Sequence, residues 1–205
     1  MHIMKINEFY TIVENDIRET FADMALKAVK ARCRYGEFTA TGGNGESCGV
    51  SMLIHPSEFE DRDMSDAYEK KYEECRKNAE DCFAVDVENG NVEKDADFEE
   101  YLDGFMEDIV GKFVIKITVD DSDELGRNKI NKGWDIYEIQ YVPSVTVSAY
   151  SALVDGYEVI SEKTYFEEQV IFDNPVNNGD DIPEDDYNRL MNVLDKAAKE
   201  IAKHI

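Results

Sequence analysis

The chain has 205 residues, 42% of them hydrophobic and 11% aromatic, and its 46 acidic and 22 basic side chains give a formal net charge of −24. The hydrophobic content is sufficient for a packed core and excludes a wholly disordered chain. The charge disfavours nucleic acid and anionic membranes as direct partners, because both are negative, and it favours a basic protein. It does not indicate an oligomeric state.

The first 17 residues and the cysteines indicate the compartment. Residues 1–17 meet acidic side chains before any long apolar run, so we expect neither a signal peptide nor a membrane span. The four cysteines, at positions 33, 48, 75 and 82, lack CxxC spacing. In a helix Cys75 and Cys82 are about 10.5 Å apart along the axis, more than the roughly 7 Å a disulfide can span. We therefore predict free thiols and a cytoplasmic protein.

The N-terminal third is predicted to form a helix followed by a hairpin. Apolar residues at steps of three and four indicate one long helix over residues 5–33. Its stripe consists of Ile6, Phe9, Val13, Ile17, Phe21, Met24 and Ala28. Residues 37–54 hold two β-leaning runs around "GGNG", which indicates a hairpin or loop. No lysine or helix start follows the glycines, so a phosphate-binding loop is excluded.

Two further helices are predicted before residue 111. Ser65 is the expected N-cap of the first, which runs to Cys82 with a stripe at Tyr68, Tyr72, Cys75, Ala79 and Cys82. Asp97 followed by Glu100 resembles a capping box and starts the second. Its stripe is Phe98, Tyr101, Leu102, Phe105 and Ile109, and Gly111 is its expected end.

The period changes from residue 112, where "KFVIKITV" alternates and β-branched and aromatic residues continue to about 172. We predict three to five antiparallel strands with short turns such as "VDG", and an edge or bulge at Pro143. A last helix starts near Pro183, with a stripe at Tyr187, Leu190, Met191, Leu194, Ala198 and Ile201.

The order of elements predicts an α+β fold in a single domain, 1–205, in which N-terminal helices and a hairpin precede an antiparallel sheet closed by a C-terminal helix. A subdivision into a mainly helical part, 1–110, and a sheet with the last helix, 111–205, is the alternative. We find no internal repeat.

Motifs for metal binding and catalysis fail on spacing. Read as a calcium loop with Gly126 at position 6, "VDDSDELGRNKI" places Leu125 at position 5 and Lys132 at position 12, where a bidentate glutamate is needed. Cys48 and His55 in one strand lie more than about 20 Å apart and on opposite faces, so they do not form a nucleophile and base. The histidines and cysteines have no zinc-ligand spacing. We predict no metal and no cofactor.

Charge is concentrated in two blocks. Residues 56–110 contain 20 acidic and 6 basic side chains, and residues 152–187 contain 11 and 1. A solvated surface is served equally well by mixed signs, so this excess indicates a basic partner. The residues predicted to bind it are Glu58, Glu60, Asp61, Asp63, Asp66, Glu69, Glu73, Glu74, Glu80 and Asp81, with Asp180, Asp181, Glu184, Asp185 and Asp186.

The first hypothesis is a non-enzymatic nucleic-acid mimic that occupies the basic nucleic-acid-binding surface of a partner protein. In size and charge the chain resembles the small acidic inhibitors of the anti-restriction and anti-CRISPR type that phages and mobile elements encode. The second is an acidic interaction or assembly protein with apolar contacts. The third is a metal-dependent hydrolase that uses clustered carboxylates.

Overall fold

The computed structural model describes residues 6–33, 37–41, 47–93, 95–120, 128–131, 137–140, 144–173 and 182–205. Side chains are described for residues 18–33, 37–40, 47–93, 95–119, 144–173 and 182–205. The elements are, in order, α1 (Ile6–Arg32), β1 (Thr39–Thr41), β2 (Ser47–Ile54), the 3₁₀ turn η1 (Pro56–Glu58), α2 (Arg62–Asn89), α3 (Phe98–Met106), β3 (Ile109–Asp120), β4 (Asn128–Asn131), β5 (Tyr137–Gln140), β6 (Ser144–Asp155), β7 (Glu158–Ile171) and α4 (Glu184–Ile201).

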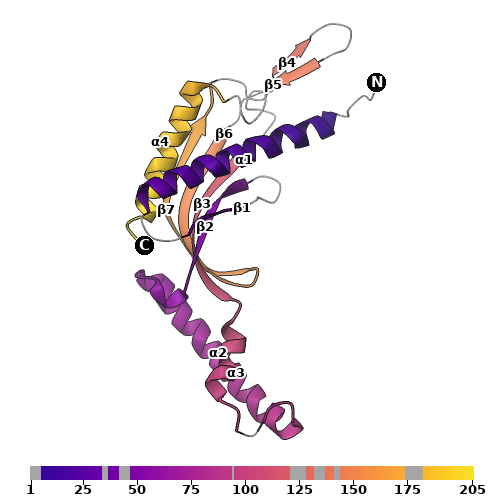
Figure 1. Cartoon of the computed structure of the whole chain (residues 1–205), viewed down its shortest axis with the longest axis vertical. Coiled ribbons are helices and arrows are strands. Elements are labelled where there is room, and N and C mark those ends of the chain that lie inside the picture. The colour runs from indigo at the N-terminus through magenta and orange to yellow at the C-terminus, as the bar shows by residue number, and fades with distance from the viewer. Residues whose placement is uncertain are drawn as a thin grey trace.

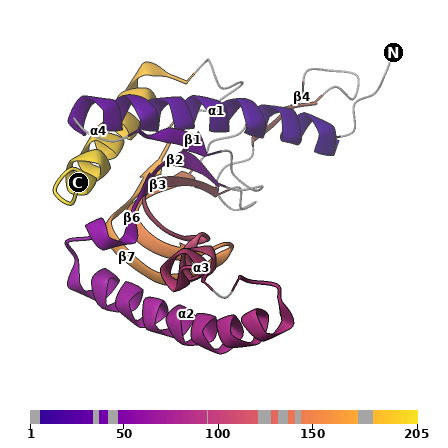
Figure 2. The ribbon, with the colours of Figure 1, turned by 60° about the horizontal axis from the view of Figure 1, so that its bottom comes forward.

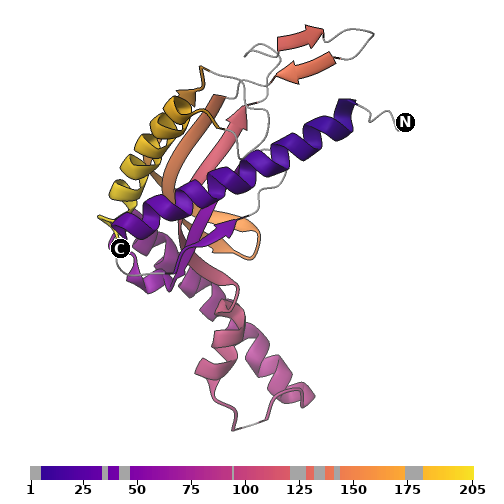
Figure 3. The same cartoon turned by 45° about the horizontal axis from the view of Figure 1, so that its top comes forward.

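The predicted α+β class is confirmed. Five antiparallel strands form one sheet in the order β1-β2-β3-β6-β7, while β4 and β5 pair separately as a two-stranded ribbon. In Figures 1 and 3 this ribbon lies beyond one end of the main sheet, and α1 and α4 lie across the sheet itself. The predicted hairpin around "GGNG" is the β1–β2 pair, and the "VDG" turn joins β6 to β7.

The core lies between the sheet and the helices α1 and α4. Alternate residues of β2, β3 and β6 point to these helices and are buried, as the period of two requires. The core residues of the strands include Val50, Met52, Phe113, Ile115, Ile117, Val145, Val147 and Ala149, and those of the helices include Phe21, Met24, Ala25, Leu190, Leu194 and Ile201. Phe21 meets Phe172 edge to face, with ring centroids 5.9 Å apart.

Gly49 allows β2 and β3 to approach closely. A Cβ atom on Gly49 would lie 2.0 Å from the Ile115 carbonyl oxygen, which is backbone and cannot turn aside. Glycine is therefore required where this hairpin joins the sheet.

The boundaries of α2 differ from the predicted ones. Asp61, not Ser65, is the N-cap, and its carboxylate accepts from the Asp63 and Met64 amides at 3.1 and 3.3 Å. Ser65 lies inside the helix, which continues seven residues past Cys82 to Gly90, the left-handed C-cap with φ +73°. The apolar stripe fades beyond Cys82 because this end of α2 is not buried by the sheet.

The predicted Asp97 cap of α3 is confirmed, since its carboxylate accepts from the Glu99 amide at 2.9 Å. The predicted end at Gly111 is wrong. The helix stops at Met106, and Ile109 and Gly111 belong to β3. Gly111 faces the Phe59 ring and Ile54, which a Cβ atom would approach to 2.8–2.9 Å, so this glycine serves packing and not a helix terminus.

Helices α2 and α3 project from the sheet. Figure 2 shows α1 and α4 at one end of the molecule and α2 and α3 at the other, with the strands between them. We call residues 72–108 the arm. Its α2 part has 18 residues, Tyr72 to Asn89, and is about 27 Å long at 1.5 Å per residue. The tested calcium loop, centred on residues 121–127, and Pro143 lie outside the described residues.

Candidate protein-binding arm

Ion pairs and a backbone hydrogen bond attach the arm to the end of the sheet. Lys163 of β7 pairs with the α2 cap Asp61, and its Nζ is 3.9 Å from an Asp63 oxygen. Further along α2, Lys71 Nζ lies 2.8 Å from an oxygen of Asp155, at the end of β6. The Gly156 amide donates to the Asp108 carbonyl. The first ten residues of α2 are thus held to the β6–β7 hairpin, and the rest extends past it.

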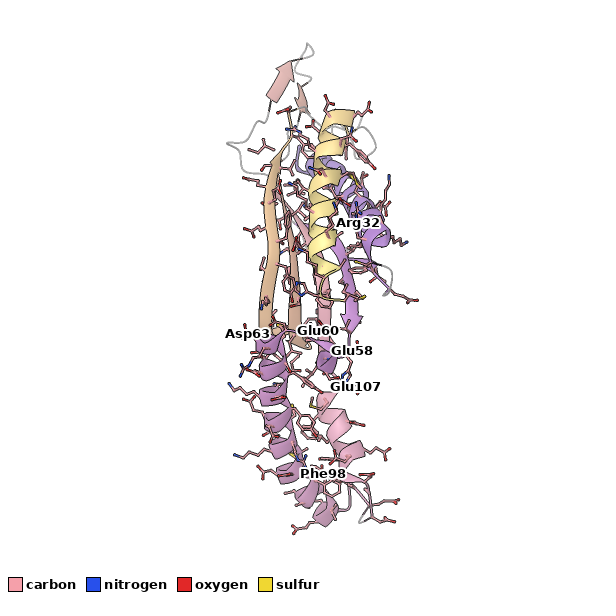
Figure 4. The ribbon with its side chains drawn as sticks, turned by 90° about the vertical axis from the view of Figure 1, so that its left-hand side faces the viewer. Arg32, Glu58, Glu60, Asp63, Phe98 and Glu107 are labelled. Atoms are coloured by element: carbon pink, nitrogen blue, oxygen red, sulfur yellow. The ribbon has the colours of Figure 1, made fainter. Side chains whose placement is uncertain are left out.

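Aromatic rings hold α2 to α3 inside the arm. Phe83 of α2 meets Phe98 and Tyr101 of α3 with centroids 5.5 and 5.1 Å apart, and Tyr101 also meets Phe105. Edge-to-face and tilted ring pairs of this kind stabilise beyond the area they bury. Figure 4 shows Phe98 far down the arm, well away from the sheet. The arm therefore has an apolar interior, which continues the hydrophobic core of the sheet, and presents a fixed surface.

A hydrogen bond beside these rings joins the two helices. The Tyr101 hydroxyl donates to Asp86 Oδ2 at 2.6 Å, and the Asn91 amide donates to Asp86 Oδ1 at 3.1 Å. The bond from Tyr101, followed by that from Asn91, lowers the pKa of Asp86. The same bond raises the pKa of Tyr101 to about 12. Asp86 is consequently ionised and Tyr101 protonated at neutral pH.

The arm carries a dense negative charge. Residues 72–108 contain 14 acidic and 3 basic side chains. Fourteen carboxylates along about 27 Å is one per roughly 2 Å, close to the one phosphate charge per about 1.7 Å of duplex axis. Most of them are exposed and have no ion pair with a described residue. These are Glu73, Glu74, Asp81, Glu88, Glu93, Asp95, Glu99, Glu100, Asp103, Glu107 and Asp108.

The structure places the first predicted block along the sheet–arm junction and α2. Nine of its ten residues, Glu58, Glu60, Asp63, Asp66, Glu69, Glu73, Glu74, Glu80 and Asp81, are exposed. Figure 4 shows Glu58, Glu60 and Asp63 where the sheet meets the arm, with Glu107 just below. Asp61 is the exception, because it is half-buried as the helix cap and as the partner of Lys163.

The second predicted block does not join the first. Asp180 and Asp181 lie outside the described residues. Glu184 and Asp185 are exposed in the first turn of α4, which begins at the end of the sheet away from the arm (Figure 1). Asp186 is fully buried, accepts from the Asp173 amide at 3.0 Å and pairs with Arg189. Its role is to anchor the start of α4, so it is not an accessible binding residue.

Sequence reasoning missed the acidic residues of the second arm helix. Glu99, Glu100, Asp103 and Glu107 are exposed on or beside α3 and extend the surface that α2 begins. These residues belong to the same acidic block, 56–110, so the charge pattern could have indicated them. They were not predicted because nothing in the sequence showed that α3 packs beside the outer half of α2.

The rejected catalytic pair is separated in the fold. Cys48 is buried near the start of β2, and burial raises the pKa of its thiol to about 12. His55 follows the other end of β2, where its Nδ1 accepts from the Ser57 amide at 3.3 Å. The four cysteines are free thiols. Among the described side chains, no three His, Cys, Asp or Glu residues converge as metal ligands.

Two surface grooves are present in the described part of the chain. One, of about 490 Å³, runs along α2 and is lined by Asp66, Tyr68, Glu69, Lys70, Tyr72 and Glu73. The other, of about 500 Å³, lies at the free edge of β2 and is lined by Glu37, Thr39, Met52, Leu53, Ile54, Glu58 and Ile205. We call the second the β2-edge groove.

These features define an acidic α+β protein with a projecting helical arm. Comparison with protein-family models, with curated proteins and with solved structures gave no match. None of the described helices is both long and apolar enough to cross a membrane.

Proposed function

We propose that this protein is a non-enzymatic acidic binder whose arm occupies the basic, nucleic-acid-binding surface of a partner protein. The observation that supports this most strongly is the spacing of charge on the arm, one carboxylate per roughly 2 Å against one phosphate per about 1.7 Å of duplex. A groove lined with lysine and arginine to bind phosphates accepts carboxylates by the same charge-assisted hydrogen bonds.

The construction of the arm also supports the proposal. The aromatic contacts between Phe83 and α3 fix the two helices relative to each other, so the backbone that carries the carboxylates does not have to be ordered when the partner binds. Ion pairs hold the arm at its base and leave its outer surface to solvent. Concentrated charge on one projecting element steers a basic partner to that element.

A pair of matched variants tests the proposal. The arm-neutral variant carries Glu73→Gln, Glu74→Gln, Asp81→Asn, Glu88→Gln, Glu99→Gln, Glu100→Gln and Asp103→Asn. The sheet-neutral variant changes the same number of exposed acids elsewhere: Glu19→Gln, Asp23→Asn, Glu158→Gln, Glu162→Gln, Glu167→Gln, Glu184→Gln and Asp185→Asn. Both variants have a net charge of −17 instead of −24. The second also removes Glu184 and Asp185, the two predicted residues of the second block that are described as exposed.

The experiment is affinity capture from a cell extract at low salt, followed by elution with duplex DNA. We expect wild type and the sheet-neutral variant to retain nucleic-acid-binding proteins that the duplex then releases, and the arm-neutral variant to lose them. Retention of no such protein by wild type would overturn the proposal. Equal loss in both variants would show that net charge acts without the arm and would also contradict it.

The interaction or assembly hypothesis has one observation in its favour. Of the large apolar side chains that are exposed, two, Leu53 and Ile205, line the β2-edge groove together, whereas Val85, Tyr157, Val159 and Ile171 lie elsewhere. This groove is at the sheet and not on the arm.

A further inference from the structure

The β2-edge groove lies where the sheet lacks part of an edge strand. Strand β2 runs from Ser47 to Ile54, but its outer neighbour β1 pairs only with Gly49, Val50 and Ser51. The last three residues, Met52–Ile54, therefore have β3 on one side and no strand among the described residues on the other. The groove of about 500 Å³ occupies this position.

The backbone direction shows which groups of β2 have no partner among the described residues. The Ile115 carbonyl points to β2, because it lies 2.0 Å from the Cβ position of Gly49. The Ser51 carbonyl points the other way, to β1, and accepts from the Thr39 hydroxyl at 3.4 Å. Backbone amide and carbonyl directions alternate from one residue of a strand to the next. The amide and carbonyl of Leu53, two residues after Ser51, therefore also point away from β3. No described residue provides a hydrogen bond to this Leu53 amide or carbonyl.

The two edges of the sheet differ in how they are protected. The edge strand β7 carries Glu158, Glu162, Lys163, Glu167 and Glu168, and charges of this kind prevent pairing with other strands. The open end of β2 has no charged residue. Leu53 is 66% exposed, and Ile205 beside it is 45% exposed. An unpaired backbone with apolar side chains is the arrangement that accepts an added strand.

We propose that the β2 edge at Met52–Ile54 binds an extended peptide segment of a partner protein in which apolar residues alternate with lysine or arginine. Backbone hydrogen bonds to Leu53 provide the pairing, and Met52, Ile54 and Ile205 receive the apolar side chains. Glu37 and Glu58, which also line the groove, attract the basic ones. A second copy of the chain is disfavoured, because pairing would bring together the acidic rims of two molecules of net charge −24.

Peptide binding at the β2 edge does not depend on the arm, and one substitution removes the backbone donor on which it rests. Leu53→Pro removes the outward amide donor, and the ladder to β3 does not use that donor, so the sheet is retained. Leu53→Ala is the matched control that keeps the donor and loses the side chain. The probe is a short synthetic peptide that alternates valine and lysine, compared with a valine–glutamate peptide and with the valine–lysine peptide methylated on its backbone nitrogens.

Titration followed by NMR, with amide hydrogen exchange, provides the readout. We expect the valine–lysine peptide to slow exchange of the Leu53 amide and to bind Leu53→Pro about tenfold more weakly than Leu53→Ala. The glutamate and methylated peptides should not protect Leu53. If Leu53→Pro does not fold, the methylated peptide and the exchange of the wild-type amide still decide.

Three results would overturn the proposal. The first is equal binding to both Leu53 variants. The second is binding without protection of Leu53, which would show that the peptide is held by surface charge alone. The third is a dimer of wild type, measured by sedimentation, that Leu53→Pro dissociates, because the edge would then belong to a second copy. The arm-neutral variant should bind the peptide at the β2-edge groove as wild type does. A failure of the groove proposal is therefore distinguishable from a failure of the proposed binding by the arm.

Discussion

Helix α4 on the sheet and helix α2 at the base of the arm are both amphipathic, yet they are used differently. Seven of the 18 residues of α4 are buried, whereas only Met64, Cys75 and Ala79 are buried among the 28 of α2. Burial of the apolar face is the main source of helix stability in a protein. Helix α4 therefore closes the core, whereas most of the α2 surface stays in solvent.

Several carboxylates of α4 have basic partners, whereas most carboxylates of the arm have no described one. On α4, Asp195 pairs with Arg32 and Lys199, and Lys196 pairs with Glu168. The hydrogen bond from Arg32, followed by that from Lys199, lowers the pKa of Asp195. On the arm, Glu80 has a described basic partner in Arg76, and most other carboxylates have none. Unpaired like charges repel, so the arm retains a cost in stability that the sheet region avoids.

The largest effect is expected from Gly49→Ala in the sheet. The new methyl group would overlap the Ile115 carbonyl oxygen, and relief requires β2 and β3 to separate. We expect a loss of more than about 3 kcal/mol in the free energy of unfolding, or no folded protein. Gly104→Ala in the arm is the control, because nothing lies within 4 Å of its Cβ position. Urea denaturation measures the free energy of unfolding of both variants. Equal losses would contradict the close approach of Gly49 to the Ile115 carbonyl oxygen.

A matched pair of leucines compares the two regions directly. Leu194 of α4 and Leu102 of α3 are both buried. We expect Leu194→Ala to lower the free energy of unfolding by about 2–5 kcal/mol, because it leaves a cavity under the sheet. Leu102→Ala should instead speed amide exchange in α2 and α3 and leave the exchange of β3 and β6 unchanged. A uniform increase over the whole chain in both variants would show that the arm is not a separate unit.

Asp61 links the regions, so its substitution should have an intermediate effect. Asp61→Ala loses the helix cap and the pair with Lys163, and we expect a cost of about 1–2 kcal/mol. Asp61→Asn keeps a capping oxygen and should cost less than about 1 kcal/mol, because Lys163 is partly exposed.

The pH dependence of Asp61 has a definite sign. The hydrogen bond from Lys163 lowers the pKa of Asp61 in the folded state. Its contribution is therefore complete above the unfolded pKa, about 4, and is lost as the pH falls through the lower folded value. The stability difference between wild type and Asp61→Asn, measured by thermal unfolding, should shrink at acid pH. A constant difference would exclude the Lys163 pair as its cause.

The smallest effect is expected from Tyr101→Phe, which removes one hydrogen bond within the arm. Because the folded pKa of Tyr101 is raised to about 12, its stabilising contribution is complete below the usual value near 10 and is lost as the pH rises from there to about 12. Amide exchange around Asp86 should be faster in the variant, with the sheet unaffected. The difference spectrum should lack the tyrosine that titrates near pH 12.

Much of the fold could be predicted from periodicity, because the described part of the α1 stripe (Phe21, Met24 and Ala28), the α4 stripe and the alternation of β3 face the core. The end of α2 could not be, because beyond Cys82 the helix is held by Phe83 and α3 and not by a wide apolar face. Asp186 shows a second limit. A buried carboxylate that anchors a helix and an exposed one look alike in sequence, and only the fold shows that Asp186 is buried, accepts from the Asp173 amide and pairs with Arg189.

The central claim, that the arm is the surface that binds, is tested most directly by the salt dependence of binding to a captured partner. Between about 50 and about 200 mM salt, we expect the Kd of wild type and of the sheet-neutral variant to rise by at least about tenfold. The arm-neutral variant should bind weakly, with a much shallower dependence on salt. The same slope for all three proteins would contradict the claim.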